Sequence, residues 1–487
     1  MSSITAQGAK GIVWTSFSAV GRGGAQLLVL SILSRLLTPT DFGVASAAMV
    51  IANLSLIFSE LGVSAAVVQR QSLDTDFLAT AQFVGLLLSG ALYLVVANFS
   101  STFADLMRIP ALSDVLPILG IAFLIRGLSQ TAEGILTRNM RFKALSIIEF
   151  ISYLVGYGVV GTVTAVSGFG YWSLVYSHLS QNIIQAVCFM VLAKPPISIT
   201  PNWGDVRALF LFGNSISFGQ LASHMALNGD NFVVSRWLGA SCLGIYSRAY
   251  QLLVMPAALF GQVVSKVLFP LLSSIQNNPS RVGSIYSRIV GVVALAVLPV
   301  QVFFWCLAPE VVNFLLGPKW HSVIQPFKIL VLALFFRTAY KISEPVLKSL
   351  GKVTSLAMAQ VFYAVIVVFG CLFSWRYGLN AIALTVSIAV AVHFSVLQYL
   401  CWKYTKYSQL VYWRELTPGV MNSLIVIITT IPLSSLLRSF DSNSFIILFL
   451  CFGLCLVNCS MMMKLNASVF SGNAGGLIYD KLKNMVV

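Results

Sequence analysis

The chain has 487 residues, of which 58% are hydrophobic and only 9% are charged, and its formal net charge is +15. A water-soluble domain normally carries charge on about a quarter of its residues, so this composition excludes an ordinary soluble domain. The positive charge alone would suit a nucleic-acid partner, but its distribution along the chain, described below, argues against one. The composition indicates a membrane protein.

Apolar segments of roughly twenty residues, long enough to cross the hydrocarbon core of a bilayer, recur along almost the whole chain. Short polar connectors separate these segments. We therefore predict an all-α membrane protein with about fourteen transmembrane helices. The expected spans are 12–34, 43–68, 77–99, 115–136, 146–167, 171–193, 208–234, 244–271, 286–308, 323–347, 354–374, 379–402, 418–437 and 444–463.

The first expected span carries a full positive charge, Arg22, in the stretch SAVGRGGAQLLVL. Residues three and four apart share one face of a helix, which places Arg22 on the same face as Thr15, Ser18 and Gln26. Such a polar stripe does not face lipid, because an ionised side chain near the bilayer centre costs at least ~3 kcal/mol. Arg22 and Gln26 are therefore predicted to face the interior of the bundle.

The fourth and tenth expected spans carry matching polar stripes. Each stripe has an arginine, a polar or basic residue four positions later, and a glutamate three positions after that. The residues are Arg126, Gln130 and Glu133 in the fourth span and Arg337, Lys341 and Glu344 in the tenth. Two interpretations remain open, because each arginine and glutamate either form a structural pair or line a polar cavity.

Basic groups outnumber acidic ones on these three helices, so the predicted cavity is net positive and suits an anionic substrate. Arginine is the side chain best shaped to bind phosphate. The predicted substrate-binding residues are Arg22, Gln26, Arg126, Gln130, Arg337 and Lys341. The candidates to carry a coupling proton or sodium ion, or to act as counter-ions for the arginines, are Glu60, Glu133, Asp230 and Glu344. We predict no catalytic residue, no metal site and no other cofactor.

Basic residues are distributed unevenly between the two sides of the membrane. If the N-terminus is cytoplasmic, most lysines and arginines outside the spans fall in inside connectors. The outside connectors hold only Arg35, Arg108, Arg236, Lys319, Arg376 and Arg438. This bias follows the positive-inside rule and explains most of the surplus charge as a signal of orientation. Both termini are thus expected in the cytoplasm.

The two halves of the chain resemble each other. The stretch LSRLLTPTDFGVAS from Leu33 aligns without a gap with VSRWLGASCLGIYS from Val234, at an offset of 201 residues. A second pair, RGLSQTAEGIL from Arg126 and RTAYKISEPVL from Arg337, aligns at an offset of 211 residues. Six helices per copy predict two lobes related by an axis along the membrane normal. The expected parts are a six-helix lobe at 1–200, its repeat at 201–410, and two additional helices with a cytoplasmic tail at 411–487.

Three stretches resemble motifs of the bacterial Wzx-type polysaccharide repeat-unit flippases, particularly the colanic-acid-type exporters. They are LSRLLTPTDFGVASAAMVIANLSLIFSELGVSAAVVQR, LNGDNFVVSRWLGASCLGIYSRAYQLLVMP and LLGPKWHSVIQPFKIL. The resemblance covers residues ~10 to 410 and implies the two-lobed fold of the MATE-like MOP exporter superfamily. It also implies a transporter and not an enzyme.

The resemblance implies transport of an oligosaccharide repeat unit, carried on undecaprenyl pyrophosphate, from the cytoplasmic to the periplasmic leaflet of the bacterial inner membrane by alternating access. Such transport serves the synthesis of exopolysaccharide, O-antigen or capsule. The implied partners are this lipid-linked oligosaccharide, membrane lipids, a polysaccharide polymerase and a chain-length regulator. Lipid II flippases look richer in arginine in the first lobe, whereas span 43–68 here has Glu60 and no basic residue. This difference argues against lipid II as the substrate.

Two rival interpretations remain. A MATE-type small-molecule antiporter has the same architecture, but its substrates are commonly cationic and favour a net negative cavity. A membrane polymerase or glycosyltransferase usually needs a sizeable outer loop to hold catalytic groups. The outside connectors here are at most about fifteen residues long, around 100–114 and 309–322.

Overall fold

The structure of the chain is a computed structural model that describes residues 21–60, 63–70, 74–196, 202–440 and 443–465. The described backbone is helical apart from short turns, and no strand occurs in it. Helices satisfy their backbone hydrogen bonds internally, as a bilayer requires. The predicted all-α fold class is confirmed, whereas the expected number of about fourteen transmembrane helices stays a prediction.

The chain divides into two compact units. Unit 1 comprises Met1–Arg248 and Ala364–Ile382, and unit 2 comprises Ala249–Tyr363 and Ala383–Val487. Helix α10 (Trp203–Ser273) begins in unit 1 and ends in unit 2. The lobe boundaries expected from the repeat, at residues 200 and 410, stay predictions.

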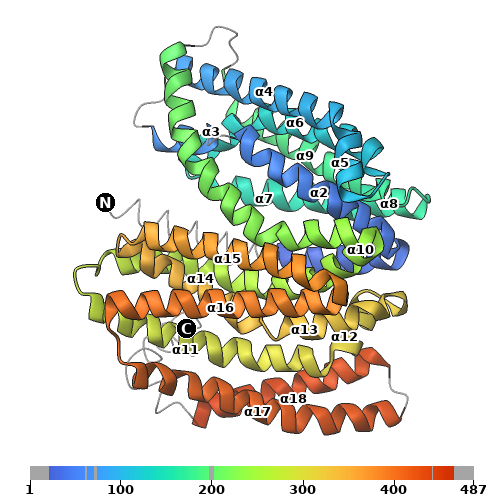
Figure 1. The fold of residues 1–487 in the computed structure, drawn as a ribbon, viewed down its shortest axis with the longest axis vertical. Coiled ribbons are helices and arrows are strands. Elements are labelled where there is room, and N and C mark those ends of the chain that lie inside the picture. Colours follow the sequence, from blue (N-terminus) through green and yellow to red (C-terminus); the bar gives the residue numbers. More distant parts are fainter. Residues whose placement is uncertain (1–20, 61–62, 71–73, 197–201, 441–442, 466–487) are drawn as a thin grey trace. The chain divides into compact units, whose positions relative to one another are not determined.

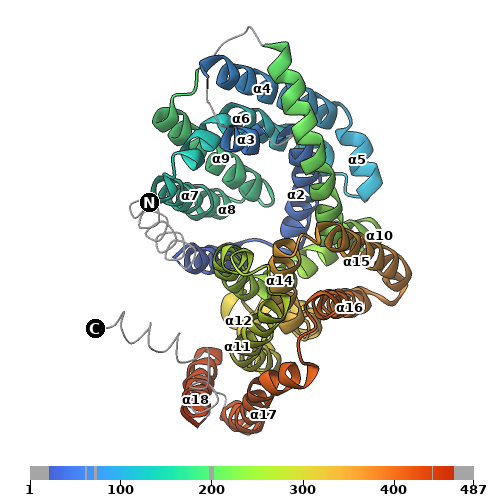
Figure 2. The same cartoon turned by 90° about the vertical axis from the view of Figure 1, so that its left-hand side faces the viewer.

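Helix α6 (Leu112–Arg138) packs in unit 1 against α4 (Thr75–Asn98) and α9 (Trp172–Ala193), as Figures 1 and 2 show. Small residues allow this close packing, since a side-chain carbon on Gly127 of α6 would collide with Ser89 of α4. The other elements of unit 1 include a helix at 21–36, α2 (Pro39–Glu60), α3 (Val63–Gln69), α5 (Ser100–Met107), α7 (Phe142–Tyr153), a π-helical segment (Leu154–Val160), α8 (Gly161–Val166) and the first part of α10.

Helix α11 (Pro279–Cys306) packs in unit 2 against α14 (Leu334–Ser349) and α17 (Gln409–Ser439). Gly419 of α17 leaves room for the backbone of α11 at Ala294, which is the usual role of small residues between membrane helices. The other elements of unit 2 are the last part of α10, α12 (Ala308–Leu315), a 3₁₀ turn (Pro318–Val323), α13 (Ile324–Val331), the first part of α15 (Val353–Ser374), most of α16 (Leu379–Thr405) and α18 (Ser444–Leu465). The second part of α15, the 3₁₀ turn that follows it (Trp375–Tyr377) and the first turn of α16 belong to unit 1.

Eight helical segments in the described residues are long and apolar enough to cross a membrane, and a bent pair makes a ninth if it is counted as one span. These segments confirm a multi-pass membrane protein. They are Thr75–Asn98, Leu112–Arg138, Phe142–Val166, Trp172–Ala193, Pro279–Cys306, Val353–Tyr377, Leu379–Thr405, Gln409–Ser439 and the bent pair Pro318–Val331 with Leu334–Ser349.

The expected tenth span, 323–347, is not a continuous helix. It breaks between α13 and α14 with a bend of 47°. Gln301 of α11 supports this break, because its side-chain nitrogen donates to the carbonyl oxygen of Leu332 (3.2 Å) and its oxygen accepts from the backbone N–H of Phe335 (2.9 Å). Broken membrane helices persist where side chains satisfy the freed backbone groups. Arg337 therefore lies in the first turn of α14, just after a supported break.

A second difference from the sequence expectation lies in the fifth span, 146–167. Its middle third is π-helical between α7 and α8. Gly156 in this segment lies against the backbone of α9 at Ser177, where a side-chain carbon would not fit. Wider π-helical turns shift the side chains that follow them and often occur at functional sites.

The two copies of the repeated motif cross each other within unit 1. A side-chain carbon on Gly43 of α2 would collide with the Ala240 carbonyl oxygen, and one on Gly244 of α10 would collide with the Pro39 carbonyl oxygen. The two contacts are equivalent under the repeat, because Gly43 corresponds to Gly244 and Pro39 corresponds to Ala240 at the offset of 201 residues. The hydroxyl of Ser46 lies 3.1 Å from that of Ser247, a pair that is also 201 residues apart. The crossing of α2 and α10 is thus symmetric under the repeat.

Helix α10 changes direction just before this crossing. Gly239 has φ 85° and ψ 176°, a conformation that only glycine adopts without strain. The break lies between the spans expected at 208–234 and 244–271. It places Ala240 and Gly244 against α2.

Candidate functional site

Arg22 forms an ion pair within unit 1. Its Nη1 lies 2.6 Å from Oε2 of Glu149 on α7, and 37% and 42% of the two side chains are exposed. Tyr153, one turn further along α7, lies within electrostatic reach of Arg22. Gln26, one turn beyond Arg22 on its own helix, is half-buried. Arg22 thus lies beside an acidic and a phenolic side chain, while Thr15 and Ser18 of the predicted stripe lie outside the described residues.

A second cation of unit 1, Arg248 on α10, lies in the same neighbourhood. Its guanidinium carbon is 4.3 Å from the centroid of the Phe42 ring, and the group lies near Tyr153 and Tyr157. These two tyrosine rings stack with centroids 5.2 Å apart. The Nε atom of Arg248 is buried and makes no hydrogen bond to the described residues.

The sequence analysis missed Arg248, although it lies inside the expected span 244–271. Unlike Arg126 and Arg337, Arg248 has no charged counterpart in the other half of the chain, because its repeat equivalent at the offset of 201 residues is Ala47. The position of Arg248 within an apolar span was the signal that would have identified it.

Arg126 and Glu133 pair with each other on α6. Arg126 Nη1 lies 2.7 Å from Glu133 Oε2, and about a quarter of each side chain is exposed. Gln130, between them on the helix, is only 1% exposed and packs against Gly85 of α4. The structural-pair interpretation therefore describes this copy of the stripe, whereas the substrate-binding role of Arg126 and Gln130 stays a prediction.

Arg337 occupies a different environment in unit 2. It is 4% exposed, its Nη2 donates a hydrogen bond to the hydroxyl of Tyr250, and its guanidinium carbon is 4.5 Å from the centroid of the same ring. Tyr340 and Tyr363 lie nearby, and His393 packs between these two rings with centroid distances of 5.1 and 4.6 Å. Arginine lies favourably over an aromatic face, which offsets part of the cost of burying its charge.

Two nitrogen atoms of this buried guanidinium lack a hydrogen-bond partner among the described residues. Nε and Nη1 of Arg337 make no hydrogen bond to the described residues, and the recorded ion pairs do not include Arg337. Burying unpaired donors is costly. An anionic or strongly accepting oxygen would satisfy these donors, and the substrate-binding role of Arg337 and Lys341 stays a prediction.

The acidic residue of the second stripe does not pair with its arginine. Glu344 Oε2 lies 3.6 Å from Nζ of Lys348, one turn further along α14. Lys341 is half-buried and lies within electrostatic reach of both Arg337 and Glu344. The structure thus brings Arg337, Lys341 and Glu344 together but leaves the arginine without a carboxylate.

Two acidic candidates remain, Asp230 and Glu60, and the structure describes the side chain of Asp230 only. Asp230 on α10 is 2% exposed and accepts hydrogen bonds from the hydroxyl of Tyr246 (2.6 Å) and the backbone N–H of Asn231 (2.8 Å). The side chain of Glu60 lies outside the described part of the chain. No group of three potential metal ligands occurs among the described residues. The ion-coupling role of these residues stays a prediction.

Comparison with known proteins identifies the family of this chain. A family model described as "Polysaccharide biosynthesis protein" matches residues 32–325. The lipopolysaccharide biosynthesis protein WzxC of Escherichia coli is 23% identical over 339 residues, which cover 67% of this chain and 66% of the relative. The succinoglycan biosynthesis transport protein ExoT of Rhizobium meliloti is 22% identical over 394 residues, covering 81% and 76%.

Solved structures with the same fold are membrane transporters. The lipid II flippase MurJ in an inward closed conformation has a TM-score of 0.79 at 16% identity, covering 95% of this chain and 99% of MurJ. An inward-facing multidrug resistance MATE transporter of the MOP superfamily has a TM-score of 0.66 at 15% identity, covering 80% and 98%. The resemblance to polysaccharide exporters and the MATE-like fold, both inferred from the motifs, are confirmed. The chain belongs to the polysaccharide biosynthesis protein family.

Proposed function

We propose that this protein transports oligosaccharide repeat units linked to undecaprenyl pyrophosphate from the cytoplasmic to the periplasmic leaflet of the bacterial inner membrane. The names of WzxC and ExoT, which refer to lipopolysaccharide and succinoglycan, support a polysaccharide cargo. The fold shared with MurJ supports a mechanism in which a lipid-linked headgroup crosses the membrane. The glycan itself is assigned only as a bacterial surface polysaccharide unit.

The main support for the proposal is the environment of Arg337. Its guanidinium is buried against Tyr250 and has two unpaired nitrogen atoms, which is the arrangement expected for binding an anionic oxygen ligand in a low-dielectric environment. A pyrophosphate supplies such oxygens. Because Arg337 is buried, a ligand reaches it only after α14 or its neighbours move, and an alternating-access cycle provides that movement.

Unit 1 contributes a second basic neighbourhood. Arg22 and Arg248 both lie near Tyr153, with Glu149 as the partner of Arg22. Tyrosine faces and guanidinium groups together suit a substrate that combines sugar rings with phosphate, because rings pack on aromatic faces while arginines bind the charge. We assign Arg22 and Arg248 to headgroup binding in this unit, with Arg126 held by Glu133 as a structural pair.

The orientation follows the positive-inside rule. Lysines and arginines gather where α14 and α16 end and where α11, α15 and α17 begin, at Arg281, Arg288, Lys348, Lys352, Lys403, Lys406 and Arg414. We assign this end of unit 2 to the cytoplasmic side, with both termini on that side. A polysaccharide polymerase and a chain-length regulator are the expected partners, because they use the transported unit.

Ion coupling is assigned to acidic side chains within the membrane. Asp230 is buried and accepts hydrogen bonds from the Tyr246 hydroxyl and the Asn231 backbone N–H, and Glu344 faces both Lys341 and Lys348. A proton or sodium ion bound at either group alters the local charge balance. Glu60 and Glu133 remain the other candidates.

A MATE-type exporter of small molecules is the alternative function with the same fold. Its cationic substrates require unpaired acidic groups facing a ligand. In the described part of the chain, Glu133, Glu149 and Glu344 each lie beside a basic side chain. An enzymatic role, such as polymerase or glycosyltransferase activity, has no comparable support from the family or fold.

Transport in proteoliposomes tests the proposal directly. Vesicles with the purified protein receive a fluorescent undecaprenyl-pyrophosphate oligosaccharide, and movement between leaflets is followed by quenching of the outer leaflet. We expect wild type to move the lipid and Arg337→Ala to reduce the rate by about 100-fold, since a buried charged hydrogen bond contributes about 1.5 to 3 kcal/mol and the whole cation is removed. Arg22→Ala is expected to have a smaller effect.

The controls separate folding from function. Each variant is compared at equal amounts of protein with unchanged thermal unfolding in detergent. A small organic cation is tested as cargo in the same vesicles. Wild-type export of the cation, with no movement of the lipid-linked sugar, would overturn the proposal in favour of the antiporter.

A further inference from the structure

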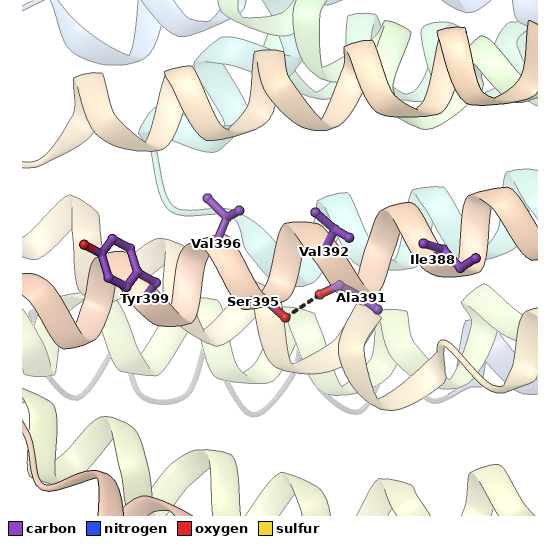
Figure 3. A pocket seen from close by; sticks show the side chains of 6 residues that line it. All are labelled: Ile388, Ala391, Val392, Ser395, Val396 and Tyr399. Carbon is purple, nitrogen blue, oxygen red and sulfur yellow. Dashed lines mark hydrogen bonds between the residues drawn. The ribbon is translucent and has the colours of Figure 1, made fainter.

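Helix α16 carries an open groove on one face within unit 2. The groove has a volume of about 460 Å³, and Figure 3 shows its lining side chains along a single helix. The lining residues are Ile388, Ala391, Val392, Ser395, Val396 and Tyr399. Its one aliphatic hydroxyl, Ser395 Oγ, donates to the carbonyl oxygen of Ala391 within the same helix (2.9 Å). The groove therefore presents an apolar surface.

The same face of α16 continues into a basic, aromatic end. The lining residues recur at intervals of three and four, and the next positions of this series within α16 are Trp402 and Lys403. Lys406 directly follows the end of the helix. The ring centroids of Tyr399 and Trp402 lie 6.0 Å apart, so the last groove residue contacts the first residue of the basic end. One helix face thus joins an apolar groove to a positive charge.

Three lysines lie at this end of α16, Lys403 in its last turn and Lys352 and Lys406 in the connectors after α14 and α16. Lys352 Nζ and Lys403 Nζ lie 5.0 and 5.7 Å from the centroid of the same ring, Tyr404. Lys406 Nζ lies 4.8 Å from the centroid of Trp402, and the Tyr404 hydroxyl is 2.9 Å from that of Ser355. The two aromatic rings hold the ammonium groups within cation–π distance.

No acidic partner explains this convergence in the described residues. The three lysines are exposed, and the recorded ion pairs include none of them. Like charges gathered on one surface are stabilised by a bound anion. The neighbouring pair Glu344 and Lys348 is already matched.

We propose that this face of α16 binds an anionic phospholipid of the adjacent leaflet. One acyl chain lies in the groove, and the headgroup phosphate lies among Lys352, Lys403 and Lys406. Basic clusters beside membrane helices attract anionic headgroups with about 1 kcal/mol per lysine. The proposal does not rest on the transport function, because binding is measured without transport.

The dimensions favour a phospholipid over a longer polyprenyl lipid. Residues 388 to 399 rise by about 16 Å along a helix at ~1.5 Å per residue. This length matches one leaflet, since the whole hydrocarbon core is roughly 30 Å thick. A lipid whose headgroup stays at the lysines and whose chain ends near the bilayer centre fills the groove.

Native mass spectrometry of the full chain in detergent tests the proposal, with cardiolipin, phosphatidylglycerol and phosphatidylethanolamine as separate probes. Wild type is expected to retain the first two lipids in preference to the zwitterionic third. Lys403→Gln should weaken cardiolipin retention about fivefold, because ~1 kcal/mol corresponds to that ratio. The triple variant Lys352→Gln, Lys403→Gln, Lys406→Gln should weaken it by at least ~50-fold.

Matched controls assign the loss to this face. Val392→Trp fills the groove and should lower retention severalfold, whereas Val361→Trp makes the same change at a half-exposed position on α15 and should not. Lys194→Gln removes an exposed lysine at the end of α9 and should also have no effect. Equal retention of all three lipids, equal effects of test and control variants, or displacement of cardiolipin by equimolar undecaprenyl phosphate would each overturn the proposal.

Discussion

Helix α6 and the α13–α14 pair carry the two copies of one sequence pattern, yet they handle its charges in opposite ways. On α6, a continuous helix, Arg126 is paired with Glu133 at 2.7 Å. On α14, which follows a 47° bend, Arg337 is buried on Tyr250 while Glu344 faces Lys348. The same spacing of arginine and glutamate therefore gives an ion pair in unit 1 and, in unit 2, a buried guanidinium that forms no ion pair with its glutamate.

The crossing of α2 and α10 shows the reverse behaviour. There the contacts of Gly43 with Ala240 and of Gly244 with Pro39 are exchanged by the repeat offset, and Ser46 meets Ser247. Packing has thus kept the internal symmetry where backbones touch, whereas the charged groups have diverged. A substrate with phosphate at one end and sugars at the other is itself asymmetric, and it would be matched by different charged groups in the two units.

A covalent link at the symmetric crossing should have the largest effect. Ser46→Cys combined with Ser247→Cys places two thiols where the hydroxyls are 3.1 Å apart, within reach of a disulfide. Oxidation should abolish transport, because alternating access requires the two copies to separate or rotate. Flux in proteoliposomes before and after oxidation measures this. Single-cysteine variants serve as controls, and full activity of the oxidised double variant would contradict the prediction.

Replacing each of the two equivalent arginines, Arg337 and Arg126, by lysine should reduce transport to different extents. Arg337→Lys keeps the charge but loses the planar donor arrangement, and we expect about tenfold slower transport, equivalent to ~1.4 kcal/mol. Arg126→Lys keeps an ion pair with Glu133 and should change the rate less than twofold. Initial transport rates at equal protein amounts decide the matter. Equal losses at both positions would show that the units contribute alike.

The break between α13 and α14 should depend on Gln301. Gln301→Leu removes both side-chain hydrogen bonds to the break and leaves the Leu332 carbonyl and the Phe335 N–H unsatisfied in an apolar segment, at a cost of about 1 to 3 kcal/mol. We expect a lower unfolding temperature and slower transport. Gln301→Glu retains one acceptor and serves as the partial control. An unchanged unfolding temperature for Gln301→Leu would mean that the bend is held by other contacts.

Removal of the two glutamates should give the smallest effects, and unequal ones. Glu133→Gln breaks a close, partly buried ion pair and should destabilise the protein by about 1 kcal/mol. Glu344→Gln affects only a 3.6 Å contact with a half-exposed lysine, so its cost should stay below about 0.5 kcal/mol. Thermal unfolding of both variants in one detergent gives the comparison. A larger loss for Glu344→Gln would indicate a direct partnership with Arg337.

The sequence was sufficient to predict the fold class and the position of the polar stripes. Composition and hydropathy determine where helices cross the membrane, and the spacing of Arg126 and Arg337 determines the helix face on which each lies. The choice of partner was not predictable in this way. Glu344 lies seven residues from Arg337 and four from Lys348, and the spacing alone permits either pairing.

The sequence did not predict the break at Leu332 for a related reason. Neither glycine nor proline occurs at the break itself, and its support comes from Gln301 on another helix. Arg248 has no charged counterpart in the first copy, and its contacts with Phe42, Tyr153 and Tyr157 join elements far apart in the sequence. Both features depend on contacts between helices distant in sequence, which a pattern along one helix does not contain.

Binding of the headgroup provides the most direct test of the difference between the units. Undecaprenyl pyrophosphate is titrated into wild type, Arg337→Ala and Arg126→Ala, and the stabilisation against thermal unfolding is measured, since a ligand that binds the folded state raises its stability by mass action. We predict that the lipid stabilises wild type and Arg126→Ala equally and fails to stabilise Arg337→Ala. Stabilisation of Arg337→Ala to the wild-type extent would contradict the assignment of the pyrophosphate to the buried arginine of unit 2.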